Sequence, residues 1–345
     1  MKVVCYYPNW PYYRPGEGSY KVEDIDTSLC THLMYSFVVL DPTTHLIKIH
    51  DSWLDVDLGN IKKFTALKAS NPGVKFMLAW GGWTDSRKPG LYSTLLASPT
   101  KRAAFVTHAV SFLEEWGFDG LDLDYEYPVD VGGVQTDKAG FTSLIRELRA
   151  AFDPKGWELT AAVSASASKV DAGYEVAEIS EMLDAIHLMS YDMHGSWEDS
   201  VDHHSKLYGA AGDQLTTDYA VKHWLSRGCP RSKLVVGIPT YGRSWTLSSS
   251  TTSLGSPASG AGSPGPITAE GGFLGYNEIC QKVKDGVFTK VTDPAGKMGP
   301  YAHGGGQWVG YDDPDMAGLK ANYILEEKLG GGMFWDLPSD DFRNK

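Results

Sequence analysis

Four acidic residues close together in the chain, Asp119, Asp122, Asp124 and Glu126, have the types and the spacing that acid–base chemistry requires. Side chains two residues apart on a β-strand point to the same face. The last three acids therefore share one face, and two leucines and a tyrosine occupy the other. A strand rises about 3.3 Å per residue, so successive acids start roughly 6.6 Å apart. Confined carboxylates at such distances cannot all ionise, and the one that keeps its proton at neutral pH is suited to be a general acid.

Glu126 is the residue that we expect to donate this proton. Enzymes built on parallel β-barrels carry out chemistry at the carboxyl ends of their strands, and Glu126 is the last acid of the row and has the longest reach. Asp122 and Asp124 lie progressively deeper, where they can orient Glu126 and share a proton along the row. Asp119 is out of phase with the other three, which predicts a structural role for it.

Other interpretations of the acidic segment fit less well. A calcium-binding loop needs glycine at its sixth position and glutamate at its twelfth, but counting from Asp122 these are Tyr127 and Gly133. A solvated edge strand would tolerate alternating acids, yet the opposite face is apolar. A magnesium site stays open, although the sequence has no phosphate-binding loop to accompany it.

The acidic segment lies in the fourth of eight short apolar runs that alternate with amphipathic stretches. Runs that are apolar on both faces and alternate with helical patterns indicate a parallel sheet. Eight of them predict an α/β fold, a closed (β/α)8 TIM barrel. Ser98 and Pro99, an N-cap followed by proline at the first helical position, begin one predicted helix. The predicted strands are residues 3–7, 32–39, 74–80, 120–125, 159–163, 186–191, 234–238 and 333–335.

The length beyond a plain barrel is concentrated between the seventh and eighth runs. A Ser/Gly/Pro-rich tract, residues 248–266, is typical of an exposed loop, and strand-like pieces follow at 288–291 and 307–311. We therefore expect a catalytic barrel of residues 1–240 and 313–345. A small α+β insertion domain, residues 241–312, should lie between strand 7 and helix 7.

Composition limits the possible partners. The 345 residues include 31 Lys and Arg against 43 Asp and Glu, a formal net charge of −12. A net-acidic chain is a poor match for a phosphate backbone, so we expect no nucleic acid partner. No apolar run reaches the length of a membrane-spanning helix, so we expect no membrane insertion. Aromatic residues make up 12%, a surplus that suggests flat stacking surfaces in a cleft.

The four cysteines, Cys5, Cys30, Cys229 and Cys280, allow three full pairings. Cys5 and Cys30 lie in successive predicted strands and could form a disulfide. None is in a C-x-x-C arrangement, which disfavours zinc or redox chemistry. The histidines at positions 194, 203 and 204 lack the acid of a zinc pattern such as H-E-x-x-H. We therefore expect no metal and no cofactor.

The segment Asp119-x-x-Asp122-x-Asp124-x-Glu126 resembles the D-x-x-D-x-D-x-E signature of glycoside hydrolase family 18, the chitinases. The resemblance runs nearly end to end and is strongest to the animal type, particularly the arthropod chitinases with several modules. Further matching motifs, each at a predicted strand end, are CYYPNW at 5–10, AWGGW at 79–83, MSYDMHGSW at 189–197, PTYGRSW at 239–245 and GMFW at 332–335. Several motifs in the same order are far more specific than one.

The resemblance implies a retaining mechanism in which the 2-acetamido carbonyl of the sugar attacks the anomeric carbon. Glu126 would protonate the leaving oxygen and then activate water. Asp124 would hydrogen-bond the acetamido N–H, and Tyr191 would bind the acetamido carbonyl oxygen. Asp122 would pair with Asp124 and take up negative charge in alternation with it.

The resemblance also implies a set of substrate-binding residues that line a groove. Trp335 would form the floor under the distorted sugar, and exposed tryptophans would stack further sugars. Trp80 and Trp116 lie away from strand ends, so we expect them to pack in the core. The implied binding set is Tyr6, Trp10, Phe37, Gly81, Gly82, Trp83, Thr84, Tyr127, Met189, Asp192, Trp197, Tyr241, Arg243 and Trp335.

Some positions depart from the family pattern. Thr84 stands where the family often has Asn, which would change one sugar contact, and Pro338 replaces an acid in the motif that follows the eighth strand. Animal members often bridge a cysteine like Cys280 to one just past that motif. Without it, we expect Cys280 to be unpaired or to pair with Cys229.

The expected function is that of a secreted chitinase domain that cleaves β-1,4 linkages between N-acetylglucosamine units. Its partners would be chitin and chitooligosaccharides. We expect a monomer, and a module of a larger chain with chitin-binding domains is one arrangement that fits. Two alternatives are a non-catalytic chitinase-like lectin and an endo-β-N-acetylglucosaminidase acting on N-glycans.

Overall fold

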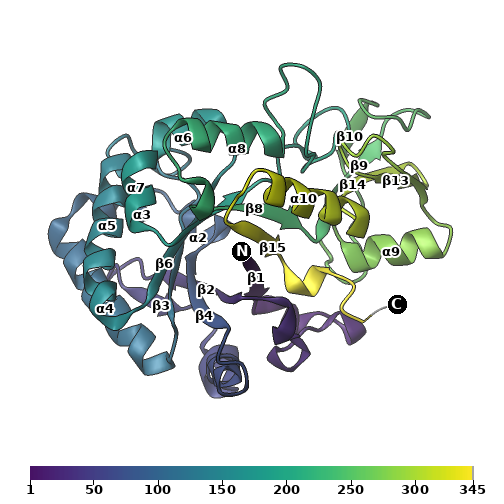
Figure 1. Cartoon of the computed structure of the whole chain (residues 1–345). Coiled ribbons are helices and arrows are strands. Elements are labelled where there is room, and N and C mark those ends of the chain that lie inside the picture. Colours follow the sequence, from purple (N-terminus) through teal and green to yellow (C-terminus); the bar gives the residue numbers. More distant parts are fainter. Residues whose placement is uncertain (344–345) are drawn as a thin grey trace.

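Eight parallel strands form a closed barrel at the centre of the computed structural model, which describes residues 1–343 (Figure 1). Strand β1 pairs with both β2 and β15, and these two pairings close the ring. Each of the eight predicted runs is one barrel strand, so the predicted TIM barrel is confirmed. The strands are β1 (Lys2–Pro8), β2 (His32–Leu40), β4 (Lys75–Gly81), β5 (Gly120–Asp124), β6 (Glu158–Ser164), β7 (Ala185–Met189), β8 (Leu234–Pro239) and β15 (Gly331–Trp335).

Two strands end earlier than predicted. Strand β5 ends at Asp124 rather than at residue 125, and β7 ends at Met189 rather than at residue 191. After Met189 the backbone turns, because Ser190 N–H donates to the carbonyl of Leu188 and Asp192 takes a left-handed φ of 57°. Glu126 and Tyr191 therefore stand just beyond their strands, at the mouth of the barrel.

Helices surround the barrel and connect its strands (Figure 1). The predicted helix that starts at Pro99 is confirmed. The Ser98 hydroxyl caps it by accepting from Lys101 N–H at 3.3 Å, and Gly117 ends it with a φ of 76°. The helices are α1 (Asn60–Ala66), α2 (Trp83–Ser86), α3 (Leu91–Ala97), α4 (Pro99–Trp116), α5 (Asp137–Phe152), α6 (Ala167–Gly173), α7 (Val176–Met182), α8 (Thr217–Ser226), α9 (Tyr276–Lys284) and α10 (Pro314–Glu326).

Two apolar layers hold the barrel together. The outward faces of the strands, including Leu121 and Leu123 of β5, pack against the helices in one continuous core. The inward faces form a smaller cluster, and Phe37, Tyr127, Tyr191 and Trp335 pack on it. The acids at 122 and 124 belong to the inward face, as the alternation predicts.

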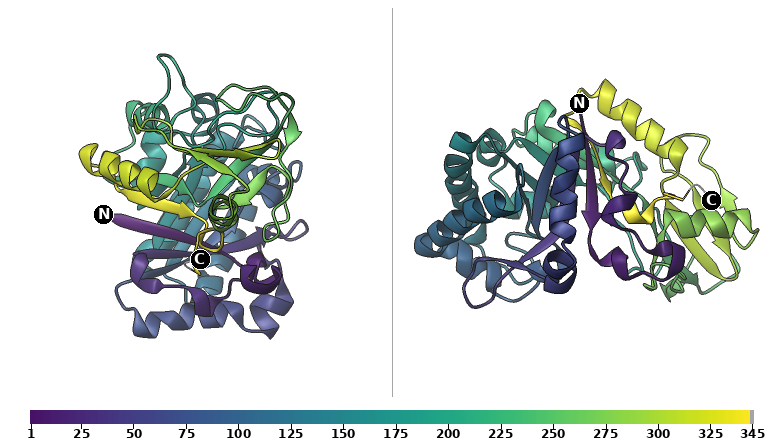
Figure 2. Two further views of the ribbon diagram at one scale, coloured as in Figure 1. Left: turned by 90° about the vertical axis from the view of Figure 1, so that its right-hand side faces the viewer. Right: turned by 90° about the horizontal axis from the view of Figure 1, so that it is seen from below.

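A second, antiparallel sheet lies between β8 and α10, where the insertion was predicted. It lies to one side of the barrel with α9 next to it (Figures 1 and 2). Trp245 and Trp308 pack edge to face in its core with ring centroids 5.5 Å apart. The strand order of this second sheet is β10-β9-β14-β13-β12, and β11 pairs with β9. A separate short strand, β3 (Ile47–Ile49), belongs to the barrel sheet and pairs with β2 at its edge. The sheet strands are β9 (Tyr241–Leu247), β10 (Ala258–Ala261), β11 (Phe273–Gly275), β12 (Thr289–Val291), β13 (Tyr301–Gly304) and β14 (Gln307–Tyr311).

The predicted disulfide between Cys5 and Cys30 is present and links β1 to the segment before β2. Cys229 and Cys280 are both free thiols, so the possible pairing between them does not form. Residues 344 and 345, the end of the expected barrel segment 313–345, lie outside the described residues. Within residues 1–343, no helix is long and apolar enough to cross a membrane.

Candidate active site

The acid row runs from the barrel interior to its mouth. Asp122 is fully buried and Asp124 is nearly so, whereas Glu126 is half-buried just beyond β5. Asp119 points elsewhere: its carboxylate binds Lys68 at 2.6 Å and accepts from Phe76 N–H at 2.8 Å. Its contacts are structural, as predicted, and three acids remain on the inward face.

Asp122 is held as a carboxylate by three donors. The Tyr6 hydroxyl donates to Oδ2 and the Thr160 hydroxyl to Oδ1, both at 2.6 Å, and Nδ1 of His187 lies 3.1 Å from Oδ1. Burial by itself would raise the pKa of Asp122. The His187 ring and these hydrogen bonds outweigh burial and hold that pKa below its ordinary value. The bottom of the row is therefore ionised.

Asp124 has the opposite environment. Its Oδ1 is buried and accepts no hydrogen bond from any described residue. Burial, followed by the charges of Glu126 and Asp122, raises its pKa well above the ordinary value. Asp124 therefore keeps a proton between two other acids, and its free carboxyl oxygen is available to a ligand.

Glu126 has the pKa that a general acid needs. Burial and then the charge of Asp192 raise the pKa of Glu126 to about 7, against the lowering effects of a hydrogen bond from Tyr127 and the charge of Lys169. Its backbone N–H donates to Ser86 Oγ at 3.0 Å, which fixes the chain just beyond β5. The carboxyl can thus donate a proton near neutral pH and then accept one.

Two glycines let the neighbouring strand end approach the acid row. A Cβ on Gly81, whose φ is 117°, would lie 2.2 Å from the carbonyl oxygen of Asp124, and one on Gly82 would lie 2.8 Å from the Phe37 ring. Gly82 N–H donates to that same carbonyl of Asp124 at 2.8 Å. Only glycine permits this close contact, which also brings Trp83 and the exposed Thr84 to the mouth of the barrel.

An aromatic floor lies beside the acid row. Trp335 stacks on Phe37 with centroids 5.7 Å apart, and its ring lies 5.4 Å from Tyr6 and 6.1 Å from Trp10. Trp10 and Phe37 are themselves stacked at 6.2 Å. Trp335 is only half-buried, so one side of this floor is available to a ligand.

Tyr191 stands just beyond the end of β7, which is separated from β15 by β8 alone. Burial, together with the charges of Asp124 and Glu126, raises the pKa of the Tyr191 hydroxyl well above its ordinary value, so it stays a donor. Among residues 1–343, the hydroxyl donates only to the sulfur of Met333, at 3.7 Å. Because sulfur is a weak acceptor, this donor is available to a carbonyl oxygen. Met189, two residues earlier, is buried in the interior cluster.

Asp192 and Arg243 form a polar wall. The Arg243 guanidinium binds both oxygens of Asp192 at 2.7 Å, and the Tyr241 hydroxyl donates to Oδ1 at 2.7 Å. His204 supports this wall, because its Nδ1 accepts from Asp192 N–H at 3.2 Å. Burial alone would raise the pKa of Asp192, but the charge and hydrogen bonds of Arg243 hold it far below the ordinary value. Asp192 is therefore a permanent acceptor and not a proton donor.

Exposed aromatic rings lie on the outer parts of the site. Trp10, Trp83 and Trp197 are 44%, 49% and 62% exposed, far more than a core residue would be. Arg87 lies over Trp83 at 4.4 Å, and Lys169 over Tyr127 at 4.7 Å. Trp80 is fully buried and Trp116 packs against the outer core, so the expectation of core packing for these two is confirmed.

Sequence reasoning missed Thr160, His187 and Phe273. Thr160 and His187 lie on inward phases of β6 and β7, so the alternation of each strand would have found them. Phe273 stacks on Tyr241 at 4.5 Å from the insertion, a contact between distant segments that no local pattern reports. Among the described residues no group of acids, histidines or cysteines could hold a metal ion.

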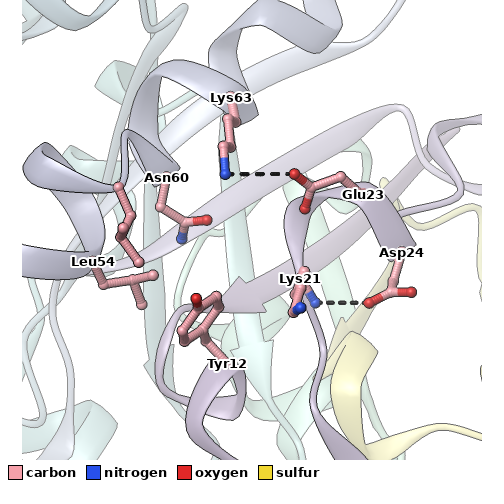
Figure 3. A pocket seen from close by; sticks show the side chains of 8 residues that line it. Tyr12, Lys21, Glu23, Asp24, Leu54, Asn60 and Lys63 are labelled. Atoms are coloured by element: carbon pink, nitrogen blue, oxygen red, sulfur yellow. Dashed lines mark hydrogen bonds and ion pairs between the residues drawn. The ribbon is translucent and has the colours of Figure 1, made fainter. Parts of the chain in front are cut away.

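A separate pocket of about 350 Å³ lies away from the acid row, between the segment that follows β1 and α1 (Figure 3). Lys63 pairs with Glu23 at 3.6 Å, and Asp24 accepts from the backbone N–H of Lys21 at 2.9 Å. The Lys21 ammonium lies over the Tyr12 ring, 5.7 Å from its centroid. No residue of the predicted site lines it. Its lining is Tyr12, Lys21, Glu23, Asp24, Leu54, Leu58, Asn60 and Lys63.

The whole barrel, together with this site, matches a known family. The model of glycosyl hydrolases family 18 matches residues 2–340. The chain belongs to this family. The expected assignment to a chitinase-type glycoside hydrolase domain is confirmed.

Curated relatives include insect chitinases, as the motifs indicate. The chain is 44% identical over 358 residues to the endochitinase of Manduca sexta, covering 99% of this chain and 64% of that protein. It is 44% identical over 354 residues to probable chitinase 10 of Drosophila melanogaster, covering 100% of this chain and 15% of that protein. The chain thus spans less than two thirds of the length of either relative.

Solved structures share the whole architecture. Catalytic domain 2 of the Group II chitinase of Ostrinia furnacalis superposes with a TM-score of 0.97 at 45% identity, covering 100% of this chain and 92% of that one. The E2180L mutant of that domain has been solved in complex with penta-N-acetylchitooctaose (NAG)5. Human YKL-39, a pseudo-chitinase with retained chitooligosaccharide binding, superposes with a TM-score of 0.91 at 37% identity, covering 99% of this chain and 94% of that one.

Proposed function

We propose that this chain hydrolyses β-1,4 linkages between N-acetylglucosamine units of chitin and chitooligosaccharides. One observation carries the proposal: a half-buried Glu126 with a pKa of about 7 stands at the top of an acid row, beside the open aromatic floor of Trp335. A carboxyl that is protonated near neutral pH can donate to a glycosidic oxygen. The flat ring beneath it suits the apolar face of a sugar. The insect relatives and the oligosaccharide-bound Ostrinia domain support chitin as the substrate.

We propose that cleavage proceeds with retention through the acetamido group of the substrate. Retaining glycosidases usually place a nucleophilic carboxylate opposite the acid, and family 18 is a known exception to that pattern. Here Asp122 and Asp124 come from the same strand as Glu126, and Asp192 is occupied by Arg243. No acid in this site is thus both free and opposite Glu126.

The roles of the remaining residues follow from this mechanism. Asp124, protonated and with a free oxygen, would bind the acetamido group, and the Tyr191 hydroxyl would donate to its carbonyl oxygen. Asp122 supplies the negative charge beneath them. The Asp192–Arg243 pair would bind sugar hydroxyls. The exposed rings of the binding set, Trp10, Trp83 and Trp197, would stack further sugars along the groove.

Hydrolysis of a fluorogenic chitooligosaccharide by the wild type and by Glu126→Gln tests the proposal. The wild type should turn over and the variant should retain binding with almost no turnover. The likeness to YKL-39 makes a non-catalytic lectin the rival function. Equal inactivity of both proteins, with chitooligosaccharide binding intact, would establish the lectin and refute the enzyme.

Substrate assistance makes a separate prediction. Oligomers that lack the acetyl group at the cleaved sugar should not turn over, and a thiazoline mimic of the cyclic intermediate should inhibit. Cleavage of deacetylated or cellulose-type oligomers at comparable rates would refute this mechanism while leaving the hydrolase assignment in place.

We also propose that the protein acts outside the cell, as a monomer, with residues 241–312 as a distinct insertion domain. The Cys5–Cys30 disulfide supports an oxidising compartment. Detection of the protein in the culture medium would test secretion, and sedimentation would test the monomer. Limited proteolysis that removes residues 241–312 as one fragment would support the domain division.

A further inference from the structure

Asp55 is a fully buried carboxylate outside the barrel, in the single π-helical turn Trp53–Asp57. The N–H of Leu58 donates to the carbonyl of Trp53 at 2.9 Å, which is the hydrogen-bond pattern of such a turn. π-Helical turns are rare and frequently occur at functional sites. None of the family motifs quoted above includes Asp55, and no step of the proposed mechanism uses it.

Neutral donors satisfy the Asp55 carboxylate. The side-chain amide of Asn9 donates to both oxygens at 3.0 Å, and the Tyr35 hydroxyl donates to Oδ1. The Tyr35 oxygen accepts in turn from the side-chain amide of Asn60 at 2.8 Å, a residue that lines the pocket of Figure 3. Burial raises the pKa of Asp55 to about 6, against the hydrogen bonds from Tyr35 and Asn9. Because a buried carboxylate is costly unless it is hydrogen-bonded, the fold depends on these donors.

The two donors to Asp55 belong to the segments that carry the aromatic floor. Asn9 directly follows β1 and precedes Trp10. Tyr35 is on β2, two residues before Phe37. Trp10 and Phe37 stack on each other with centroids 6.2 Å apart. Asp55 therefore joins the two backbone segments whose rings form this stack.

Packing alone does not fix the Trp10 ring. It is 44% exposed, and the rings that it contacts, those of Phe37 and Trp335, belong to the floor themselves. Its place therefore depends on the backbone of Asn9, a buried residue whose side chain Asp55 holds. Without the carboxylate, a buried amide and a buried hydroxyl would lose their acceptor, which favours a rearrangement of both segments.

We propose that Asp55 is a positioning residue for substrate binding, whose carboxylate fixes Trp10 and Phe37 as one continuous floor with Trp335. This rests on the function proposed above. Because Asp55 is fully buried, it touches no sugar and acts only through its two donors. Trp335 lies beside the acid row, whereas Trp10 is the more exposed, outer ring. The effect of Asp55 should therefore grow with the number of sugars bound.

The experiment is titration calorimetry with chitohexaose and chitobiose in a Glu126→Gln background, which prevents hydrolysis, at a pH well above the pKa of Asp55. Asp55→Leu has a similar volume but accepts no hydrogen bond. The exchanged pair, Asn9→Asp with Asp55→Asn, keeps one carboxylate and one amide at the contact and an acceptor for Tyr35. Val56→Ala, in the same turn but with a 42% exposed side chain, is the matched control.

Binding of the long oligomer should respond most. Asp55→Leu should weaken the binding of chitohexaose by about tenfold, the size of one lost aromatic contact, and that of chitobiose by much less. The exchanged pair and Val56→Ala should bind both oligomers as the background protein does. With Glu126 present, Asp55→Leu should raise KM for chitohexaose by a similar factor and leave kcat within about twofold of the wild type.

Three outcomes would overturn the proposal. Asp55→Leu could weaken both oligomers by the same factor, as a general loss of structure would, or it could bind both as the background protein does. The third outcome is that the exchanged pair behaves as the leucine variant does. Asp55→Asn replaces Asp55→Leu if the latter does not fold.

A second readout needs no ligand, and so separates this proposal from the proposed function. In protein labelled with 5-fluorotryptophan, fluorine NMR observes each ring, and the Trp10 signal is assigned by its loss in Trp10→Phe. This signal should shift or broaden in Asp55→Leu and keep its wild-type position in the exchanged pair, while the signal of the fully buried Trp80 stays unchanged in both. That result supports the proposal even if the wild type proves inactive. An unmoved Trp10 signal in Asp55→Leu overturns it.

Discussion

Replacing Glu126 with glutamine gives a quantitative test of why this carboxyl keeps its proton. Glutamine has nearly the shape of a protonated glutamic acid but cannot ionise. Burial and the charge of Asp192 raise the pKa of Glu126 from an ordinary 4.5 to about 7. The folded protein therefore binds this proton more tightly than the unfolded chain does. The contribution of Glu126 to wild-type stability should fall as pH rises from 4.5 to 7 and then level off, because above pH 7 both states have lost the proton.

The size of the effect follows from the pKa difference. Each pKa unit corresponds to about 1.36 kcal/mol, so ionisation of Glu126 destabilises the folded state by about 3 kcal/mol at most. Glu126 is half-buried, and solvent screening reduces this figure. Relative to the wild type, Glu126→Gln should gain up to this amount of unfolding free energy between pH 4.5 and 8.

Urea unfolding of both proteins at several pH values measures the difference directly. Subtracting the two curves removes the groups that titrate alike in both proteins and leaves the contribution of Glu126 together with its effect on Asp124, whose pKa the charge of Glu126 raises. In parallel, wild-type kcat/KM should fall about tenfold for each pH unit above 7, as the proton of the acid is lost. A difference in stability that does not change with pH would refute the raised pKa of Glu126, and with it the general-acid assignment.

Three further predictions concern the framework of the site. Trp335→Ala should lower kcat/KM by about tenfold with little change in stability, because one face of this ring is open. The control, Trp80→Ala in the fully buried core, should instead lower the free energy of unfolding by about 3–5 kcal/mol. Similar losses of stability in both variants would contradict the assignment of Trp335 to the site. Gly81→Ala should lower the free energy of unfolding, measured in urea, by more than about 1 kcal/mol, because φ is 117° and the new Cβ would lie 2.2 Å from a backbone carbonyl oxygen of β5. An unfolding midpoint equal to that of the wild type would disprove this close contact. Replacing Cys5 and Cys30 together with serine should lower the free energy of unfolding by about 3 kcal/mol, measured without reductant, and an unchanged value would show that the bridge adds nothing.

Local patterns in the sequence determine the barrel and the direction of the acid row. The period-two alternation in residues 120–126 places the leucines outward and the acids inward, because a one-residue slip would bury carboxylates against the helices. The eight apolar runs and the capping residues Ser98 and Gly117 determine the strands and a helix in the same local way. The ends of β5 and β7 were predicted one and two residues too late. For β7, the turn at Ser190 depends on a contact with Gly237 of the neighbouring strand.

The protonation states of the acid row were decided only by the tertiary structure. Asp122 and Asp124 are the same residue type on the same face of one strand, and the sequence treats them alike. Folding brings Tyr6, Thr160 and His187, from three other strands, around Asp122. It brings no donor from the described part of the chain to Oδ1 of Asp124. A pKa depends on burial and on charges within a few ångströms, and residues far apart in the chain become neighbours only when the barrel closes.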